Sequence, residues 1–221
     1  MTPTAPAYLD IESWPRRQHF HFFKAYDNPF FNVCVNVDAT HLLRLVRSRD
    51  LAFSLTYHYL ALKAANAVEP FRYRLRGDRV LVHDRIGAGT TILLADERFA
   101  FCYFEWDDDF SRFAAASSAA VASLRAGDGR LEPREDRDDL VHCTTLPWIS
   151  FTSFSHARRW NRQDSVPKLV FGKVFQDGDR FRMPISVEVH HALMDGLHVG
   201  RYFERLEIYF ADPAAPLGLA D

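Results

Sequence analysis

Residues 185–198 read ISVEVHHALMDGLH, and this stretch predicts the local chain path more firmly than any other. Apolar residues alternate at Ile185, Val187 and Val189, which predicts a strand with one buried face. Asp195-Gly196 then precedes a segment with helical periodicity, and aspartate is a common helix N-cap. The sequence therefore predicts a strand that ends at a histidine pair, a tight loop, and a last helix over about 195–210.

The histidine pair at the strand end is the best candidate for chemistry. A neutral imidazole, with an ordinary pKa near 6.5, can take a proton from an alcohol at neutral pH. The alternatives are that His190 and His191 are core-edge residues and that Asp195 only caps the helix. A metal site that adds His198 is disfavoured, because adjacent strand residues point in opposite directions and no HExxH spacing occurs.

Hydrophobic periodicity also predicts the helices and strands in the rest of the chain. Periodicity predicts helices at 14–24, from Asp38 through 46, 54–68 and 107–125, with Ser13 as a cap for the first. Alternating runs predict strands at 30–37, 71–75, 80–84, 90–95, 99–105, 140–144, 148–154, 168–176 and 180–189. Several of these strands follow one another closely enough to form hairpins, and helices lie between them. The pattern predicts one α+β domain over residues 1–221, with a mixed, mostly antiparallel sheet.

Composition narrows the class of protein. The 221 residues carry a formal net charge of −2, which does not favour binding to nucleic acid or an anionic membrane. The three cysteines are widely spaced without a CxxC pattern, which favours buried reduced thiols. The first residues lack a signal-peptide pattern and no apolar run reaches membrane-spanning length, so we expect a cytoplasmic enzyme or binding protein.

Three segments together carry a family resemblance. Residues 190–199, HHALMDGLHV, resemble the HHxxxDGxH signature of chloramphenicol acetyltransferases. The HxxxDG core alone also occurs in dihydrolipoyl acyltransferase cores, peptide-synthetase condensation domains and plant acyltransferases. However, residues 14–20 (WPRRQHF) look like the family's W-x-R-R-E-H-F element, and residues 146–154 (LPWISFTSF) are similar to its PWxxFxSF run. The chain is thus identified as a member of this family, which implies a two-layer α/β sandwich.

The resemblance implies roles for individual residues. His191 would be the general base that takes the proton of an alcohol whose oxygen attacks acetyl-CoA, the co-substrate; no metal is implied. Asp195 would form a structural salt bridge with Arg16. Thr144 matches the serine that stabilises the oxyanion, although it is also typical as a β-branched strand residue.

Further positions match the family's substrate and cofactor sites. Phe22, Phe23 and Phe99 correspond to aromatic pocket positions, His142 to a polar position near the reacting centre, and Lys173 to a cofactor-contacting segment. For the phenylalanines, ordinary core packing is the alternative. Family members are homotrimers, which implies that His191 comes from one subunit and Phe22, Phe23 and Thr144 from its neighbour.

Departures from the family pattern leave the acceptor open. Asp27 stands where drug-binding relatives have an apolar residue, Val174 stands in place of a tyrosine, and Thr144 replaces serine. The expected activity is acetyl transfer to chloramphenicol, which would confer resistance, or to another small-molecule alcohol. The alternatives are a non-catalytic trimeric binder of the same fold and a dihydrolipoyl-type core, although the latter's Ala/Pro-rich linkers are not evident.

Overall fold

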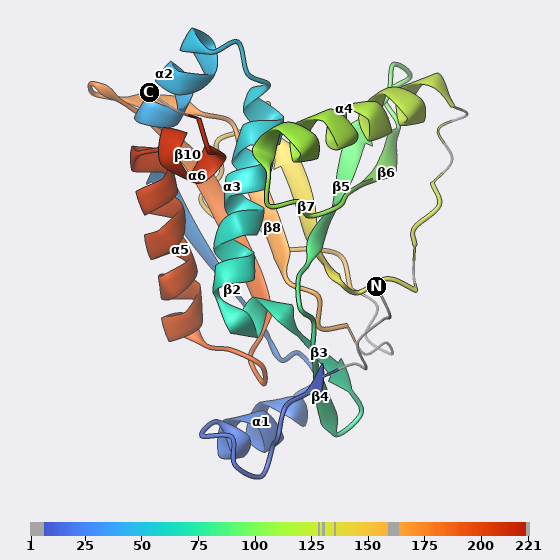
Figure 1. Cartoon of the computed structure of the whole chain (residues 1–221). Helices are drawn as coiled ribbons and strands as arrows, with labels where there is room; N and C mark the ends of the chain where they lie inside the picture. The colour runs from blue at the N-terminus through green and yellow to red at the C-terminus, as the bar shows by residue number, and fades with distance from the viewer. Residues whose placement is uncertain (1–6, 128, 130, 135, 159–163, 220–221) are drawn as a thin grey trace.

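The computed structural model describes residues 7–127, 129, 131–134, 136–158 and 164–219. Its main body is a sheet with helices on one face (Figure 1). The strands of this sheet are β2 (Phe30–Asp38), β5 (Gly87–Leu93), β6 (Phe99–Phe104), β7 (Leu140–Leu146), β8 (Lys168–Gly172), β9 (Phe175–Asp177) and β10 (Arg180–His190). The helices are α1 (Arg17–Lys24), α2 (Thr40–Ser48), α3 (Phe53–Ala67), α4 (Phe110–Ala126), α5 (Gly196–Ala211) and α6 (Ala214–Leu217), with a 3-10 turn η1 (Glu69–Arg72). The expectation about a signal peptide rests largely on residues 1–6, which lie outside the described residues.

The strand order is β2-β10-β8-β7-β5-β6, with β9 paired to β10 beyond β8. Strand β7 runs parallel to both of its neighbours, β5 and β8, and the other pairings are antiparallel. This mixture confirms the predicted α+β class with a mixed, mostly antiparallel sheet. Because α3, α4 and α5 lie on one face of this sheet, the main body has the two layers that the resemblance implied (Figure 1).

Side-chain alternation explains which face of the sheet the helices cover. Ile185, Val187 and Val189 of β10 are fully buried in the main hydrophobic core, which α3 and α5 complete. Ser186 and Glu188, in between, point to the opposite face. Within the described residues, no helix is long and apolar enough to cross a membrane.

A second, smaller sheet supports α1 beside the end of β10. It consists of β1 (Ala7–Tyr8), β4 (Arg79–Val82) and β3 (Tyr73–Arg76), in that order. A separate hydrophobic cluster joins Phe20 of α1 to Tyr73 and Leu75 of β3 and to Ala192 and Leu193, which follow β10. Burial of these side chains therefore fixes α1 against the turn that carries His191.

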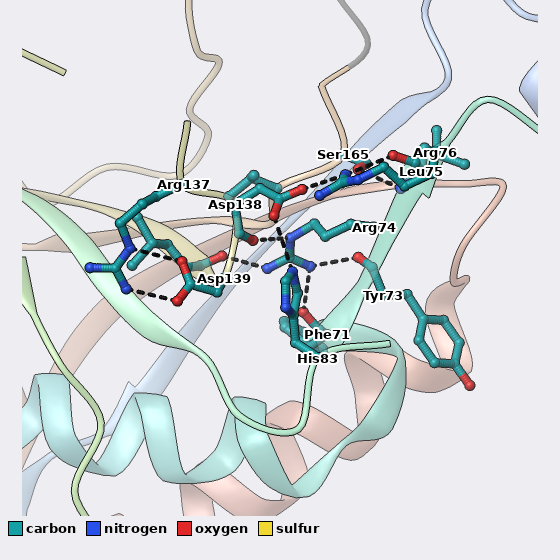
Figure 2. Close-up of polar contacts among 12 residues, drawn as sticks. Phe71, Tyr73, Arg74, Leu75, Arg76, His83, Arg137, Asp138, Asp139 and Ser165 are labelled. Carbon is teal, nitrogen blue, oxygen red and sulfur yellow. Dashed lines mark hydrogen bonds and ion pairs between the residues drawn. The ribbon is translucent and has the colours of Figure 1, made fainter. Parts of the chain in front are cut away.

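Arg74 of β3 ties the small sheet to the main one (Figure 2). Its fully buried guanidinium donates to the carbonyls of Asp138 and Leu140 at the start of β7 and to those of Phe71 and Tyr73. Burial lowers the pKa of Arg74 to about 10, so the group stays charged at neutral pH. One side chain thus satisfies four carbonyls on two segments that are distant in sequence.

Several local predictions were wrong, two at the start of an element and one in its whole length. The first helix begins at Arg17, and the Ser13 hydroxyl donates to Asp10 instead of capping it. The predicted strand over 71–75 begins only at Tyr73, because η1 takes up the residues before it. Residues 148–154 form no strand, and the backbone of Ile149 instead closes a turn onto Leu146 and accepts from the Lys173 amide.

Candidate active site

The end of β10 is held by backbone hydrogen bonds. The His191 amide donates to the carbonyl of Pro29, just before β2, at 2.7 Å. The amides of Leu193 and Met194 donate back to the His190 carbonyl at 3.0 and 3.2 Å. The strand therefore ends at the histidine pair as predicted, in a tight turn that fixes the backbone of His191.

Two aromatic rings hold the His191 imidazole. Phe23 of α1 is stacked on it, with ring centroids 3.7 Å apart and an interplanar angle of 6°. Phe31 of β2 contacts it at 4.7 Å with a tilt of 49°. Its Nδ1 atom is buried and has no hydrogen-bond partner within the described part of the chain. The half-buried ring is thus oriented mainly by packing.

Arg16 connects the helix side of this site to the turn after β10. Its Nη1 atom is ion-paired with Oδ2 of Asp195, and its Nη2 atom donates to the His191 carbonyl at 3.0 Å. Burial raises the pKa of Asp195, but the charges of Arg16 and His198 outweigh burial and hold that pKa below its usual range. One guanidinium therefore joins the aspartate to the backbone of the candidate base.

Asp195 also caps α5, as the sequence indicated. Its Oδ1 atom accepts from the Leu197 amide at 3.1 Å and lies 2.8 Å from Nδ1 of His198. The same carboxylate thus serves the helix end with one oxygen and Arg16 with the other. Both readings of Asp195, as a cap and as a salt-bridge partner, are compatible with these contacts.

His190 occupies a different environment from His191. Its Nδ1 atom accepts from the Ala192 amide at 3.2 Å, and its ring meets Phe30 edge-on at 4.9 Å. Burial lowers the pKa of His190 to about 4, which keeps its imidazole neutral at physiological pH. Across the described ranges, no group of three or more His, Cys, Asp or Glu side chains is placed to hold a metal ion.

Thr144 lies far from His191 within one chain. Strand register places Thr144 opposite Val170 and Val170 opposite Ser186, so Thr144 is level with Ser186 and two strands away from it. His191 is five residues beyond Ser186, roughly 16 Å along the strand at about 3.3 Å per residue. The hydroxyl of Thr144 and the imidazole of the same chain therefore cannot act on one small substrate.

The other predicted residues are distributed unevenly. Phe22 is 59% exposed on α1 and contacts Phe23 at 5.1 Å, beside the imidazole. Phe99 lies on edge strand β6, four strands from β10, where it is 49% exposed. His142 lies on β7, level with Glu188 and two strands from it, and Lys173 lies in the β8–β9 connection. One chain thus brings together His191, Arg16, Asp195 and the phenylalanines of α1.

One detail of the expected subunit arrangement needs correction. The resemblance implied that Phe23 faces His191 from a neighbouring subunit, but Phe23 stacks on His191 of its own chain. The cause is the hydrophobic cluster that fixes α1 to the turn after β10. Phe31 was not identified as a site residue from sequence, although its place at the start of a strand with an apolar face was a usable signal.

The comparisons with known proteins agree with one another. A family model described as chloramphenicol acetyltransferase matches residues 6–207. The chloramphenicol acetyltransferase of Proteus mirabilis is 28% identical over 202 residues, which cover 91% of this chain and 93% of that protein. Chloramphenicol acetyltransferase 3 of Escherichia coli is 28% identical over 201 residues, covering 90% of this chain and 94% of that protein.

Solved structures give the same picture. One named chloramphenicol acetyltransferase superposes with a TM-score of 0.85 at 26% identity, and the match covers 93% of this chain and 100% of that one. The dihydrolipoamide acetyltransferase of Azotobacter vinelandii superposes with a TM-score of 0.67 at 17% identity, covering 98% of this chain and 100% of that one. The second likeness shows a common fold only.

Proposed function

The chain belongs to the chloramphenicol acetyltransferase family of acyltransferases, and on this premise we propose that it transfers an acetyl group from acetyl-CoA to the hydroxyl of chloramphenicol or a related small-molecule alcohol. The observation that carries the proposal is the His191 ring, held between Phe23 and Phe31 with its backbone carbonyl bound by Arg16. A base whose ring is fixed in this way is suited to take a proton from a hydroxyl that binds beside it.

In the proposed reaction, the neutral imidazole of His191 accepts the proton of the acceptor hydroxyl. The alcohol oxygen attacks the thioester carbonyl and forms a tetrahedral oxyanion. Collapse of this intermediate breaks the carbon–sulfur bond, and the departing CoA thiolate takes the proton back from the imidazolium. The products are the acetyl ester and free CoA, and the enzyme returns to its starting state.

Arg16 and Asp195 act as positioning residues in this scheme. The Arg16 guanidinium is bound by the Asp195 carboxylate and in turn holds the His191 carbonyl. Because Asp195 is itself fixed as the cap of α5, the backbone of the base is connected to a helix end. We expect this connection to preserve the orientation of the imidazole during turnover.

Thr144 is proposed as the donor that stabilises the oxyanion, supplied by a second copy of the chain. The separation of Thr144 from His191 within one chain supports this arrangement. We therefore propose a homotrimer in which His191, Phe22 and Phe23 face Thr144, His142 and Phe99 of a neighbour. Each oxyanion donor of this kind contributes about 10²–10³-fold in rate.

A hybrid-trimer experiment tests the shared site. His191→Ala and Thr144→Ala variants are each expected to be nearly inactive. When they are mixed, unfolded together and refolded, some interfaces combine an intact histidine with an intact threonine. An equal mixture should regain about a quarter of wild-type activity for random cyclic trimers. A mixture that stays as inactive as its components would refute the two-copy site.

The activity itself is tested by thiol release from acetyl-CoA. Wild-type protein should release CoA when chloramphenicol is added, and His191→Ala should abolish release while keeping the same thermal unfolding midpoint. If chloramphenicol gives no release, a panel of small alcohols tests the broader acceptor class, and the resistance role is withdrawn. Acetyl-CoA binding without turnover on any alcohol would contradict the proposal and favour a non-catalytic trimeric binder.

The remaining elements of the proposal concern the co-substrate. Lys173 is an exposed cation in the β8–β9 connection, suited to the anionic groups of CoA. A Lys173→Ala variant should raise the KM for acetyl-CoA more than it lowers kcat.

Because acetyl-CoA is a cytoplasmic metabolite in bacteria, we propose that the reaction takes place in the cytoplasm.

A further inference from the structure

The sheet opens in its middle, where β5 and β7 separate. The ladder between these parallel strands ends at the pair Thr90 and Cys143. Strand β5 continues along β6 as far as Leu93, and β7 continues along β8 as far as Leu146. The last three residues of β7, from Thr144 onward, therefore have a ladder partner on one side only.

A side chain from the helix layer is attached to this half-supported stretch. The Oη atom of Tyr57, on α3, lies 3.1 Å from Oγ1 of Thr145. Tyr57 is only 3% exposed, and its ring contacts Phe53 and Phe171 at centroid distances of 5.1 and 4.7 Å. Because aromatic neighbours on α3 and β8 hold the ring, its hydroxyl is a fixed point from which Thr145 is held.

The position of Thr145 bears directly on Thr144. Val141, Cys143 and Thr145 point toward the helices, so Thr144 points to the opposite face of the sheet. A shift of the Thr145 backbone moves the Thr144 hydroxyl by a similar distance. An oxyanion donor works only within about 2.7–3.1 Å of the oxygen, and a displacement of about 1 Å can reduce a rate about 100-fold.

We propose that the hydrogen bond between Tyr57 and Thr145 positions the Thr144 hydroxyl for oxyanion stabilisation; this inference rests on the function proposed above. This hydrogen bond holds Thr145, the residue next to the donor, at a point where β7 has no ladder with β5. Tyr57 touches no substrate in this scheme and is a positioning residue. Burial raises the pKa of Tyr57 to about 12, so its hydroxyl stays protonated under assay conditions.

The simpler explanation is that the buried Tyr57 hydroxyl and the half-buried Thr145 hydroxyl merely satisfy each other. Tyr59 provides a matched control for it. It lies on the same helix, is 1% exposed, and donates its hydroxyl to the Asp108 carbonyl at 2.8 Å, away from β7. Replacement of either tyrosine by phenylalanine removes one partly buried hydrogen bond and keeps the ring.

The test measures kcat and KM by CoA release for Tyr57→Phe, Tyr59→Phe, Thr145→Val and Thr145→Ser in the full-length chain. We expect Tyr57→Phe and Thr145→Val to lower kcat by about 5- to 50-fold, with little change in either KM. Thr145→Ser retains a hydroxyl and should restore most of the activity. Tyr59→Phe should keep wild-type kcat.

The decisive measurement repeats Tyr57→Phe in a Thr144→Ala background. If Tyr57 acts through the Thr144 hydroxyl, the second substitution changes kcat by less than about two-fold. An equal loss in both backgrounds, or a loss in Tyr59→Phe as large as in Tyr57→Phe, overturns the proposal. So does unchanged kcat in Tyr57→Phe when wild-type protein turns over. If wild-type protein acetylates no alcohol, the proposed function fails first, and this inference fails with it.

Discussion

Asp195 should contribute to stability through two separable interactions, and substitution can distinguish them. One carboxylate oxygen caps α5 through the Leu197 amide, and the other is ion-paired with Arg16. Asparagine retains an acceptor for the cap but removes the charge, whereas alanine removes both. We therefore expect Asp195→Ala to be more destabilising than Asp195→Asn at neutral pH.

The magnitudes follow from exposure of the two partners. Loss of a helix cap costs about 1 kcal/mol. Breaking a fully buried ion pair costs about 3–5 kcal/mol, but the Arg16 and Asp195 side chains are 13% and 32% exposed, which reduces this to about 1–2 kcal/mol. Asp195→Asn should thus lower the free energy of unfolding by about 1–2 kcal/mol, and Asp195→Ala by about 2–3 kcal/mol.

The sign of the pH dependence gives a second check. Because the pKa of Asp195 is depressed in the folded state, its stabilisation is fully present above the unfolded pKa of about 4 and is lost as pH falls through the folded value. The difference in unfolding free energy between wild type and Asp195→Asn should therefore become smaller at acidic pH. Urea denaturation at pH 7 and pH 3.5 measures this difference. Equal unfolding free energies for Asp195→Asn and Asp195→Ala at pH 7 would refute the separate cap.

Three further predictions concern other parts of the molecule. Arg74→Met leaves four carbonyls without their donor, so it should lower the free energy of unfolding, measured by urea denaturation, by about 3–5 kcal/mol. A loss below about 1 kcal/mol would contradict the role of Arg74 in joining the two sheets. Phe23→Leu removes a stacked ring from His191 and should lower kcat about 3- to 10-fold in the CoA-release assay, whereas unchanged kcat would mean that packing by Phe31 suffices. Burial raises the pKa of Asp138, but His83 and Arg76 outweigh it and hold that pKa well below its usual range, so Asp138→Asn should destabilise the protein at pH 7 and still at about pH 3, and the difference should be lost only as pH falls toward the folded pKa. Urea denaturation at both pH values measures the difference, and a difference that has already vanished at about pH 3 would contradict the role of its charge.

Sequence alone was sufficient for the elements whose signal is local. Three such signals are the alternation in β10, the cap at Asp195 and the helical periodicity of α3. Each depends only on residues that are close together in sequence. The candidate base could be placed at a strand end for the same reason. Local signals failed where another group competed for the same atoms. The nearby Asp10 carboxylate accepts from the Ser13 hydroxyl, and the amide of Lys173, distant in sequence, donates to the Ile149 carbonyl.

Tertiary structure decided which of these residues meet. Arg16 and Asp195 are 179 positions apart, and only the docking of α1 on the small sheet brings them together. The stack of Phe23 on His191 has the same origin, whereas the bond between Tyr57 and Thr145 depends on the packing of α3 over the main sheet. The separation of Thr144 from His191 follows from strand order and register. Periodicity reports which face of an element is buried, but not which partner covers it, because that choice depends on packing across the whole core.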